Sequence, residues 1–467
     1  MNWDSVGAYG CPVPGTTPHI DALASVSTRF TNAYVTVGVC APSRGVMMTG
    51  RYPHSTGATG FGLMPASVRT VPELLKAAGY VCGIIDKIGH LRPVEKYGWA
   101  KTYADTSNGR SPKSYGRITG EFIKFARESG RPFFLMANAR DPHRPFAGSR
   151  QERQYIDNPR NADERNWAQP RAVAGMGRPS RIFRTDEVVV PAFLPDIPDI
   201  REEVANYYSS VRRCDDTVGA ILEALEDSGQ SADTIVLFLS DNGMAFPFAK
   251  FSCYPNGTRT PLIVRWPGRT RENEVMNEVV GGVDLAPTLL EAAGVHPPSE
   301  MDGRSFLPLL LGADQEDRVR AFAAFYETQL REQVPTRAVY ERQYCYIYNR
   351  WSDGATECQD EFHKGLALQA IIEAARTDGV IAKRLVHFLF RTPEELYDMT
   401  SDPHALRNLA DNTAYRETLE RLRGEMETWM IKTGDPLLPV FRACRAGVII
   451  PMSGPPEPGG AKAPSKK

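Results

Sequence analysis

Apolar runs and helical patterns alternate over roughly the first 325 residues of this 467-residue chain. Short runs rich in β-branched and aromatic residues predict strands at 79–85, 132–138, 234–240 and 261–264. Between them, apolar positions at helical spacing predict helices over 71–78 and 200–228. This alternation predicts the α/β class, with a mainly parallel central sheet flanked by helices on both faces.

The pattern changes at three places along the chain. Residues 146–184 are polar, Arg-rich and nearly aperiodic, so we expect either a functional surface loop or a disordered segment there. Beyond residue 325, short strands at 337–340 and 344–348 precede a closing helix at 414–432. We therefore expect three units, namely a large α/β domain over 1–325, a smaller C-terminal α+β subdomain over 326–450 and a disordered tail over 451–467.

The composition is that of an ordinary globular protein, and it excludes several function classes. Lys plus Arg number 55 and Asp plus Glu number 56, so bulk charge does not favour nucleic-acid binding, although a local basic pocket stays open. No apolar run reaches the roughly 18 residues that a membrane span needs. The eight cysteines are spread too thinly for a disulfide scaffold, and they include no C-x-x-C pair, which disfavours a structural zinc site. The sequence carries no signal for an oligomeric state.

The sharpest local signal is the segment CAPSRGVMMTGR, which begins at Cys40. A predicted strand over 29–37 ends at Gly38, and a helix is expected to begin at Cys40 with Pro42 in its first turn. Free backbone N–H groups at such a helix start suit an anion, and Arg44 adds a forked donor that matches a tetrahedral oxyanion. On these residues alone, Cys40 is either a reactive nucleophile or one more buried cysteine.

The pattern C-x-P-S-R-x-x-x-x-T-G-R over 40–51 resembles the signature of the type I sulfatase family, in which this Cys is oxidised to formylglycine. Further segments resemble family signatures and extend the resemblance over nearly the whole chain, at 17–34, 79–90, 240–250 and 395–409. Segments 140–144, 190–196 and 241–247 resemble the heparan N-sulfatase (sulfamidase) branch most closely. The resemblance implies an alkaline-phosphatase-like sandwich and the hydrolysis of a sulfate ester or sulfamate, with a sugar such as a glycosaminoglycan as the substrate class.

The resemblance also implies a role for each candidate catalytic residue. A hydrated aldehyde formed from Cys40 would offer one hydroxyl to attack sulfur and a second to expel sulfate, which a plain Ser could not do. Lys87 and His90 would hold and deprotonate the attacking hydroxyl. His143 would contact sulfate and protonate the leaving group near neutral pH, while Lys250 would neutralise a second sulfate oxygen and share the acid role.

Asp241 and Asn242 are the candidate metal ligands, together with residue 40. Both follow an apolar predicted strand and would emerge at its carboxyl end, where open α/β sheets bind ligands. As hard oxygen donors they suit one Ca²⁺ ion rather than zinc. Read without the resemblance, the same residues would form an Asn-Gly turn after a strand.

Three departures from the family pattern are visible. Two residues separate Lys87 from His90, where the family more often has one, and Asp86 replaces a usual Gly. The resemblance also begins just past the strand and Asp-Asp pair with which such sulfatases start. We therefore expect either an internal start codon or a truncated chain, and a chain that starts at Met1 should leave sheet edges unpaired.

Three rival functions stay open from the sequence. A phosphonate or phosphate monoester hydrolase would share the fold, a non-catalytic sulfated-glycan-binding relative would lack the N-terminal metal pair, and a thiol hydrolase would use unmodified Cys40. The expected partners are a sulfated small molecule or glycan and a formylglycine-generating enzyme, with no nucleic acid and no membrane. We expect a periplasmic or secreted protein if an export signal precedes this sequence, and a cytoplasmic one otherwise.

Overall fold

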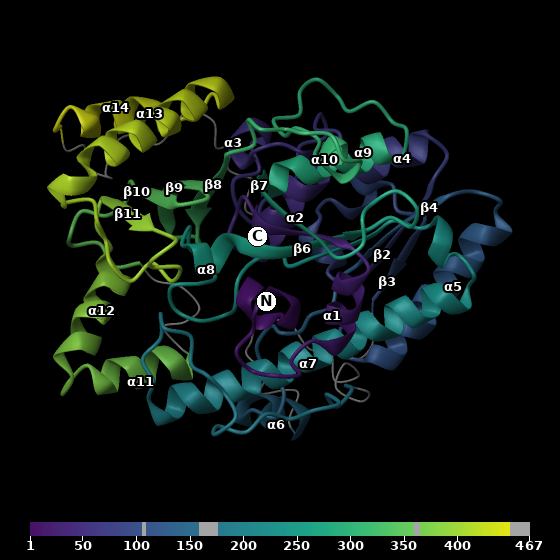
Figure 1. Cartoon of the computed structure of the whole chain (residues 1–467), viewed down its shortest axis with the longest axis horizontal. Helices are drawn as coiled ribbons and strands as arrows, with labels where there is room; N and C mark the ends of the chain where they lie inside the picture. The colour runs from purple at the N-terminus through teal and green to yellow at the C-terminus, as the bar shows by residue number, and fades with distance from the viewer. Residues whose placement is uncertain (105–108, 158–175, 359–364, 449–467) are drawn as a thin grey trace, which may run out of the picture.

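The computed structural model describes residues 1–104, 109–157, 176–358 and 365–448. The predicted tail (451–467) and the middle of the predicted loop (146–184) lie outside these residues. A large α/β region surrounds the N-terminus, and a smaller region carries the last helices, α13 (Arg416–Thr433) and α14 (Leu438–Arg445) (Figure 1). Within the described ranges, no helix combines the length and the apolar character needed to cross a bilayer.

The strands of the described residues form three sheets, with the orders β5-β6-β1-β7, β3-β2-β4 and β11-β10-β9-β8. Their bounds are β1 (Thr28–Tyr34), β2 (Val81–Ile85), β3 (Lys101–Tyr103), β4 (Phe133–Ala137), β5 (Val236–Leu239), β6 (Arg259–Arg265), β7 (Glu274–Gly281), β8 (Arg320–Glu327), β9 (Gln333–Glu341), β10 (Tyr344–Asn349) and β11 (Glu394–Asp398). In the first two sheets β1–β7, β2–β3 and β2–β4 pair in parallel, and β6 pairs antiparallel with β1 and β5. The predicted α/β sandwich with a mainly parallel sheet is therefore confirmed.

Helices cover both faces of the first two sheets (Figure 1). The remaining helices are α1 (Pro18–Ser25), α2 (Cys40–Thr49), α3 (Pro53–Thr56), α4 (Val71–Ala77), α5 (Pro112–Glu128), α6 (Arg150–Asp157), α7 (Pro198–Asp227), α8 (Pro255–Thr258), α9 (Leu285–Ala292), α10 (Leu307–Leu310), α11 (Leu366–Ala374) and α12 (Gly379–Phe390). β2 shows how the layers meet, because successive side chains of a strand point to opposite faces. Val81 and Ile85 pack against α5, whereas Cys82 and Ile84 join the core formed with α2, α4 and α9.

The strands and helices predicted from apolar patterns are all present, with ends that differ by a few residues. β7 escaped prediction because it lies at the edge of its sheet and mixes polar residues, Glu274, Asn277 and Glu278, with apolar ones, so it forms no continuous apolar run. α5 also escaped prediction, although Ser111 caps its start by accepting a hydrogen bond from the Ser114 N–H at 3.3 Å.

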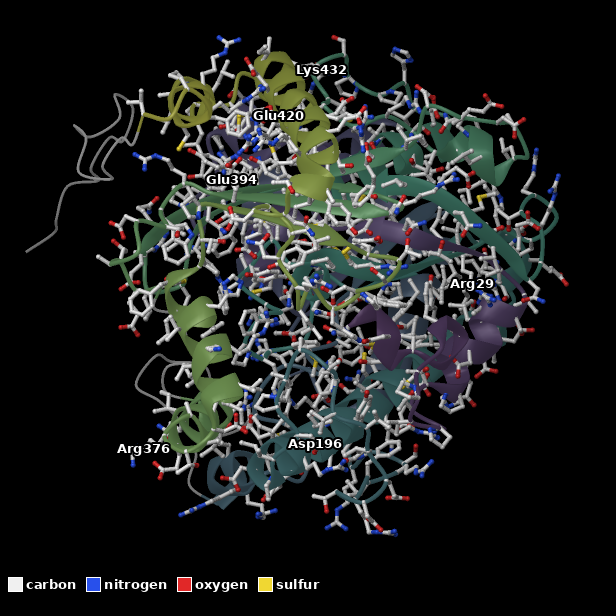
Figure 2. All side chains as sticks on the ribbon, turned by 60° about the vertical axis from the view of Figure 1, so that its left-hand side comes forward. Arg29, Asp196, Arg376, Glu394, Glu420 and Lys432 are labelled. Carbon is white, nitrogen blue, oxygen red and sulfur yellow. The ribbon has the colours of Figure 1, made fainter. Side chains whose placement is uncertain are left out.

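The smaller region is an antiparallel sheet, β8 to β11, covered by α13. The domain boundary expected at residue 325 falls inside β8. Figure 2 shows α13, marked by Glu420 and Lys432, lying across this sheet, with Glu394 on β11 beneath it. Arg423 of α13 donates to Glu394 at 2.8 Å, and a fully buried pair of Arg337 and Asp435 also ties the helical layer to the sheet. The candidate site lies outside this smaller region, in the large α/β region.

Candidate active site

The candidate residues converge where β2, β4 and β5 end and where α2 begins. Cys40 is the first residue of α2, is half-buried, and follows the extended Val39. It lines a cavity of about 660 Å³, and the other predicted residues on the cavity wall are Arg44, Lys87, His143, Asp241, Asn242 and Lys250. His90 is the exception, because it lines a small neighbouring pocket.

Arg44 lies at the centre of this cluster and contacts several of its members. One helical turn after Cys40, its Nη1 donates to the Cys40 carbonyl and to His90 Nδ1, both at 3.3 Å, and it forms an ion pair with Asp241. Its Nε donates to the Asn138 side-chain oxygen at 3.0 Å. The guanidinium is thus fixed by its own helix and by partners from three other segments, and it presents a permanent positive charge to the cavity beside residue 40.

Lys87 follows β2 in a left-handed backbone conformation, with φ of 52°, and its side chain is buried. Burial lowers the pKa of Lys87 to about 8, with Arg44 and Arg140 acting in the same direction and Cys40 opposing them. An ammonium group that has lost most of its water is a strong partner for an anion. Lys87 is therefore suited to hold a sulfate oxygen against Cys40.

His90 lies in a short 3₁₀ turn, 88–90, directly after Lys87. Because the Arg44 guanidinium can only donate, His90 Nδ1 accepts the hydrogen bond between them and its proton lies on Nε2. Burial, followed by the charges of Lys87 and Arg44, lowers the pKa of His90 far below its ordinary value. His90 is neutral and supports Arg44, and its predicted part in deprotonation stays a prediction.

His143 and Lys250 form a pair that lines the same cavity. His143 Nδ1 lies 2.7 Å from the Arg144 carbonyl and must donate to it, so Nε2 is left to accept from Lys250 Nζ at 3.3 Å. Burial, together with Lys250 and Lys87, lowers the pKa of His143 well below its ordinary value. The imidazole is therefore neutral, and its Nε2 accepts from Lys250.

Lys250 reaches the cavity because residues 243–257 fold back beneath α2. The Gly38 carbonyl accepts a hydrogen bond from the Phe251 N–H at 2.8 Å, and a Cβ on Gly38 would lie 2.3 Å from the Ser252 carbonyl oxygen. Only glycine permits so close an approach of the two backbones. This contact sets the distance between the start of α2 and Lys250.

Asp241 and Asn242 leave β5 at the same edge, as predicted. Burial alone would raise the pKa of Asp241, but Arg44, the amino terminus and Lys87 outweigh burial and hold the pKa below its ordinary value. Asn242 is buried, and its side-chain oxygen has no hydrogen-bond partner among the described residues. An ionised carboxylate beside an unsatisfied amide oxygen is a donor set that suits a hard cation such as Ca²⁺. These two side chains supply only part of the six to eight oxygens that Ca²⁺ takes.

A second grouping of possible metal ligands, His19, Asp215 and Asp216, lies where α1 meets α7. Asp215 already accepts hydrogen bonds from the N–H groups of His19 and Ile20, at 3.1 and 2.8 Å, and so caps α1. Asp216 is engaged by Ser180 and by Arg212. These carboxylates have structural partners and lie apart from the candidate active site.

Two contributors to the site were not predicted. Asn138, known from the sequence only as the end of a strand, accepts from Arg44 and donates from Nδ2 to the Ile85 carbonyl at 3.2 Å. Asp86, noted only as a departure from the family pattern, accepts from Arg140 Nε at 2.9 Å. A polar residue at the carboxyl end of a buried strand was the available signal for Asn138.

Two family models match this chain. The sulfatase model matches residues 1–295, which is more than half of the chain. A second model, N-sulphoglucosamine sulphohydrolase, C-terminal, matches residues 245–383. Together the two models run from the start of the chain through β8, β9 and β10 of the smaller sheet and into α12.

Among curated proteins, the human N-sulphoglucosamine sulphohydrolase is 31% identical over 453 residues, which covers 90% of this chain and 86% of the relative. An ulvan-active sulfatase of Formosa agariphila is 27% identical over 461 residues, covering 92% of this chain and 74% of the relative. The similarity therefore extends over most of this chain.

Solved structures show the same fold. One, determined in complex with its substrate D-glucosamine-2-N,6-O-disulfate, has a TM-score of 0.66 at 18% identity and covers 93% of this chain and 96% of its own. A phosphonate monoester hydrolase from Silicibacter pomeroyi has a TM-score of 0.61 at 17% identity, covering 94% of each chain. The fold alone thus includes more than one chemistry. The curated relative and the family models decide between them, and this chain belongs to the sulfatase family, as a sulfuric ester hydrolase of the sulfamidase-like group.

Proposed function

We propose that this protein removes sulfate from a sulfated sugar, with glucosamine N-sulfate as the first substrate to test, through a formylglycine formed from Cys40. The observation that carries the proposal is the position of Cys40 at the start of α2, facing Arg44, Lys87 and Lys250 in one cavity. Three cationic groups around one helix start suit a tetrahedral anion of high charge density. The names of the curated human relative and of the substrate in the solved structure support the sugar.

The side chain of residue 40 determines the chemistry that the site can perform. A hydrated aldehyde there supplies two hydroxyls on one carbon, one to take the sulfuryl group from the substrate and one to release it as sulfate. The chain's part is to bind and orient the sulfate. Arg44, Lys87 and Lys250 line the same cavity and would hold its oxygens.

Bond cleavage also needs a proton for the leaving sugar oxygen or nitrogen. The Lys250 ammonium holds the proton closest to His143 Nε2, and His143 is fixed by its bond to the Arg144 carbonyl. We infer that Lys250 and His143 supply this proton as a pair, because a neutral histidine of low pKa could not carry the proton by itself at neutral pH.

Asp241 and Asn242 would hold one side of a Ca²⁺ ion, which would add positive charge next to the bound sulfate. The carboxylate of Asp241 also orients Arg44 directly, so its role does not depend on the ion. Substitution of Asp241 should therefore weaken both sulfate binding and calcium binding.

The test is sulfate release by protein that has been co-expressed with a formylglycine-generating enzyme. The substrates are glucosamine N-sulfate, glucosamine 6-sulfate, an aryl sulfate and an aryl phosphonate, and Cys40→Ala is the control. The proposal predicts turnover of a sulfated sugar that is abolished in the control. Faster turnover of the phosphonate would favour the monoester hydrolase. Binding without turnover in protein with oxidised residue 40 would favour a sulfated-glycan-binding protein, and activity lost on iodoacetamide treatment would favour a thiol hydrolase.

A further inference from the structure

Arg144 directly follows His143 in the chain, but it is not among the described residues that line the cavity of the site. Its side chain is largely buried, with 15% of its surface exposed, and it contacts several separate segments. A guanidinium that lies next to a candidate catalytic residue, yet outside the cavity, is suited to position other groups rather than to bind substrate.

The first contact of Arg144 is with helix α7. Its Nη1 and Nη2 donate to the two carboxylate oxygens of Glu203, each at 2.7 Å. This bidentate pair fixes the plane of the guanidinium, and it anchors Arg144 to a helix of 30 residues (Figure 1). The Glu203 carboxylate also neutralises the guanidinium, so Arg144 acts on the site through its position rather than through its charge.

The second contact is with the segment that carries Lys250. Arg144 Nε donates to the Ala245 carbonyl at 3.2 Å. The preceding carbonyl, that of Met244, accepts from the Lys250 N–H at 3.1 Å. Arg144 therefore holds this segment one peptide unit away from the hydrogen bond that orients the Lys250 backbone.

The guanidinium also lies over two aromatic rings. Its central carbon is 4.5 Å from the centre of the Phe146 ring and 5.2 Å from that of Phe246. The two rings stack on each other, with centres 5.5 Å apart and planes inclined by 14°. Phe146 lies shortly after His143, and Phe246 lies shortly before Lys250. One guanidinium thus joins the two segments through a ring of each.

The main chain of Arg144 acts on His143. The Arg144 carbonyl accepts from His143 Nδ1 at 2.7 Å, which leaves Nε2 to accept from Lys250. The buried Arg110 donates from Nη2 to the same carbonyl at 3.1 Å and to the His143 carbonyl at 3.0 Å. Because both lone pairs of the Arg144 carbonyl are used, its direction is fixed, and the imidazole is held with it.

We propose that Arg144 is a positioning residue that sets the 3.3 Å contact between His143 Nε2 and Lys250 Nζ. Its side chain holds the Lys250 segment against α7, and its carbonyl holds the imidazole. The proposal rests on the proposed function, in which this pair supplies the proton for the leaving group. Arg144 does not contact the residues that hold sulfate from α2 and β2, so its loss should impair protonation and not sulfate binding.

The test compares two substrates that differ in their need for a proton. A sugar O- or N-sulfate has a poor leaving group that must be protonated, whereas nitrophenyl sulfate releases a stable phenolate. In protein that carries formylglycine, Arg144→Met should lower kcat by about 10²-fold on the sugar sulfate but by less than about fivefold on nitrophenyl sulfate. KM for both substrates should stay within about threefold of the wild-type value.

Arg144→Lys is a milder variant that tests the same point if Arg144→Met folds poorly. Its ammonium keeps the charge opposite Glu203, but it cannot make the bidentate pair and also reach the Ala245 carbonyl. The loss of kcat should therefore be smaller than in Arg144→Met and still be selective for the sugar sulfate.

Arg201→Met is the matched control. Arg201 also pairs with both oxygens of one carboxylate, that of Asp196, and donates to backbone carbonyls, but this pair is exposed and lies outside the cavity. It should leave kcat on both substrates unchanged. His143→Ala is the reference for a lost proton donor, and it should show the selectivity for the sugar sulfate in full.

Two results would overturn the proposal alone. One is an equal loss on both substrates in the two Arg144 variants, which would show a merely structural role, and the other is selectivity in His143→Ala that both Arg144 variants lack. Failure of the proposed function would look different. His143→Ala would then lose both substrates equally, or the wild-type protein would turn over neither, and the positioning role of Arg144 would fall with it.

Discussion

Arg44 depends on Asn138, a residue that takes no part in the chemistry itself. The Asn138 side-chain oxygen accepts from Arg44 Nε, and its amide group donates to carbonyls at the end of β2. Asn138 is thus a positioning residue that ties α2 to the carboxyl ends of β2 and β4. Without Asn138, the Arg44 guanidinium would stay in the cavity but lie in the wrong position, and this would reduce catalysis.

Asn138→Ala should lower kcat/KM for sulfate release by about 10²-fold, because Arg44 loses one of its fixed partners. Asn32→Ala is the matched control, since Asn32 donates to the Asn277 carbonyl in an exposed hydrogen bond and does not line the cavity. Kinetics and thermal midpoints of both variants are the measurement. A loss of activity that merely follows a loss of stability in the two variants would contradict the positioning role.

Lys87 should set the alkaline limit of activity. Burial lowers its pKa to about 8, and sulfate binding needs the ammonium form, so kcat/KM should fall as pH rises through about 8. Lys87→Arg keeps the charge at all accessible pH values, so this decline should shift upward or disappear in the pH–rate profile. An unchanged alkaline limit in Lys87→Arg would show that another group titrates there.

At the scale of elements, the site depends on how closely the start of α2 packs on the segment 243–257. The sequence predicted the strand before Gly38, the helix start at Cys40 and the strand before Asp241, because apolar runs and punctuating Gly and Pro residues are local signals. It did not predict the contact of Gly38 with Ser252, because that contact joins residues more than 200 positions apart.

Gly38→Ala should disable the enzyme by displacing Lys250. The new Cβ would meet the Ser252 carbonyl oxygen at 2.3 Å, so the segment has to move away from α2. We expect activity to fall by about 10²-fold or more. In Gly120→Ala, in the middle of α5, no atom would lie within 4 Å of the new Cβ, so it should be neutral or stabilise by about 0.5–1 kcal/mol. Full activity of purified Gly38→Ala would show that the contact between Gly38 and Ser252 does not position Lys250.

At the scale of the whole molecule, the sequence indicated the α/β class, the second α+β unit and the residues around Cys40. The positions of His143 and Lys250 in one pair, and the distance of His90 from the main cavity, required the tertiary structure. These contacts depend on how loops pack, and no periodicity in the chain encodes that. The same holds for the pair Arg337–Asp435, which links the smaller sheet to the residues that follow α13.

Arg337→Met should lower the free energy of unfolding by about 3–5 kcal/mol, because it leaves the fully buried Asp435 carboxylate without its partner. Arg69→Met breaks an exposed pair with Glu300 and should cost less than about 1 kcal/mol. Urea unfolding of both variants is the measurement. A similar small effect for both would show that burial does not decide the contribution of these ion pairs.

A peptide mass spectrum of active protein is the most direct test of whether residue 40 acts as formylglycine. We expect the peptide containing residue 40 to be about 18 Da lighter than its cysteine form, because an aldehyde replaces the thiol. We also expect the fraction of Cys40 converted to formylglycine to match the fraction of active enzyme. Full sulfate-releasing activity in protein whose residue 40 is an unmodified thiol would show that formylglycine is not required.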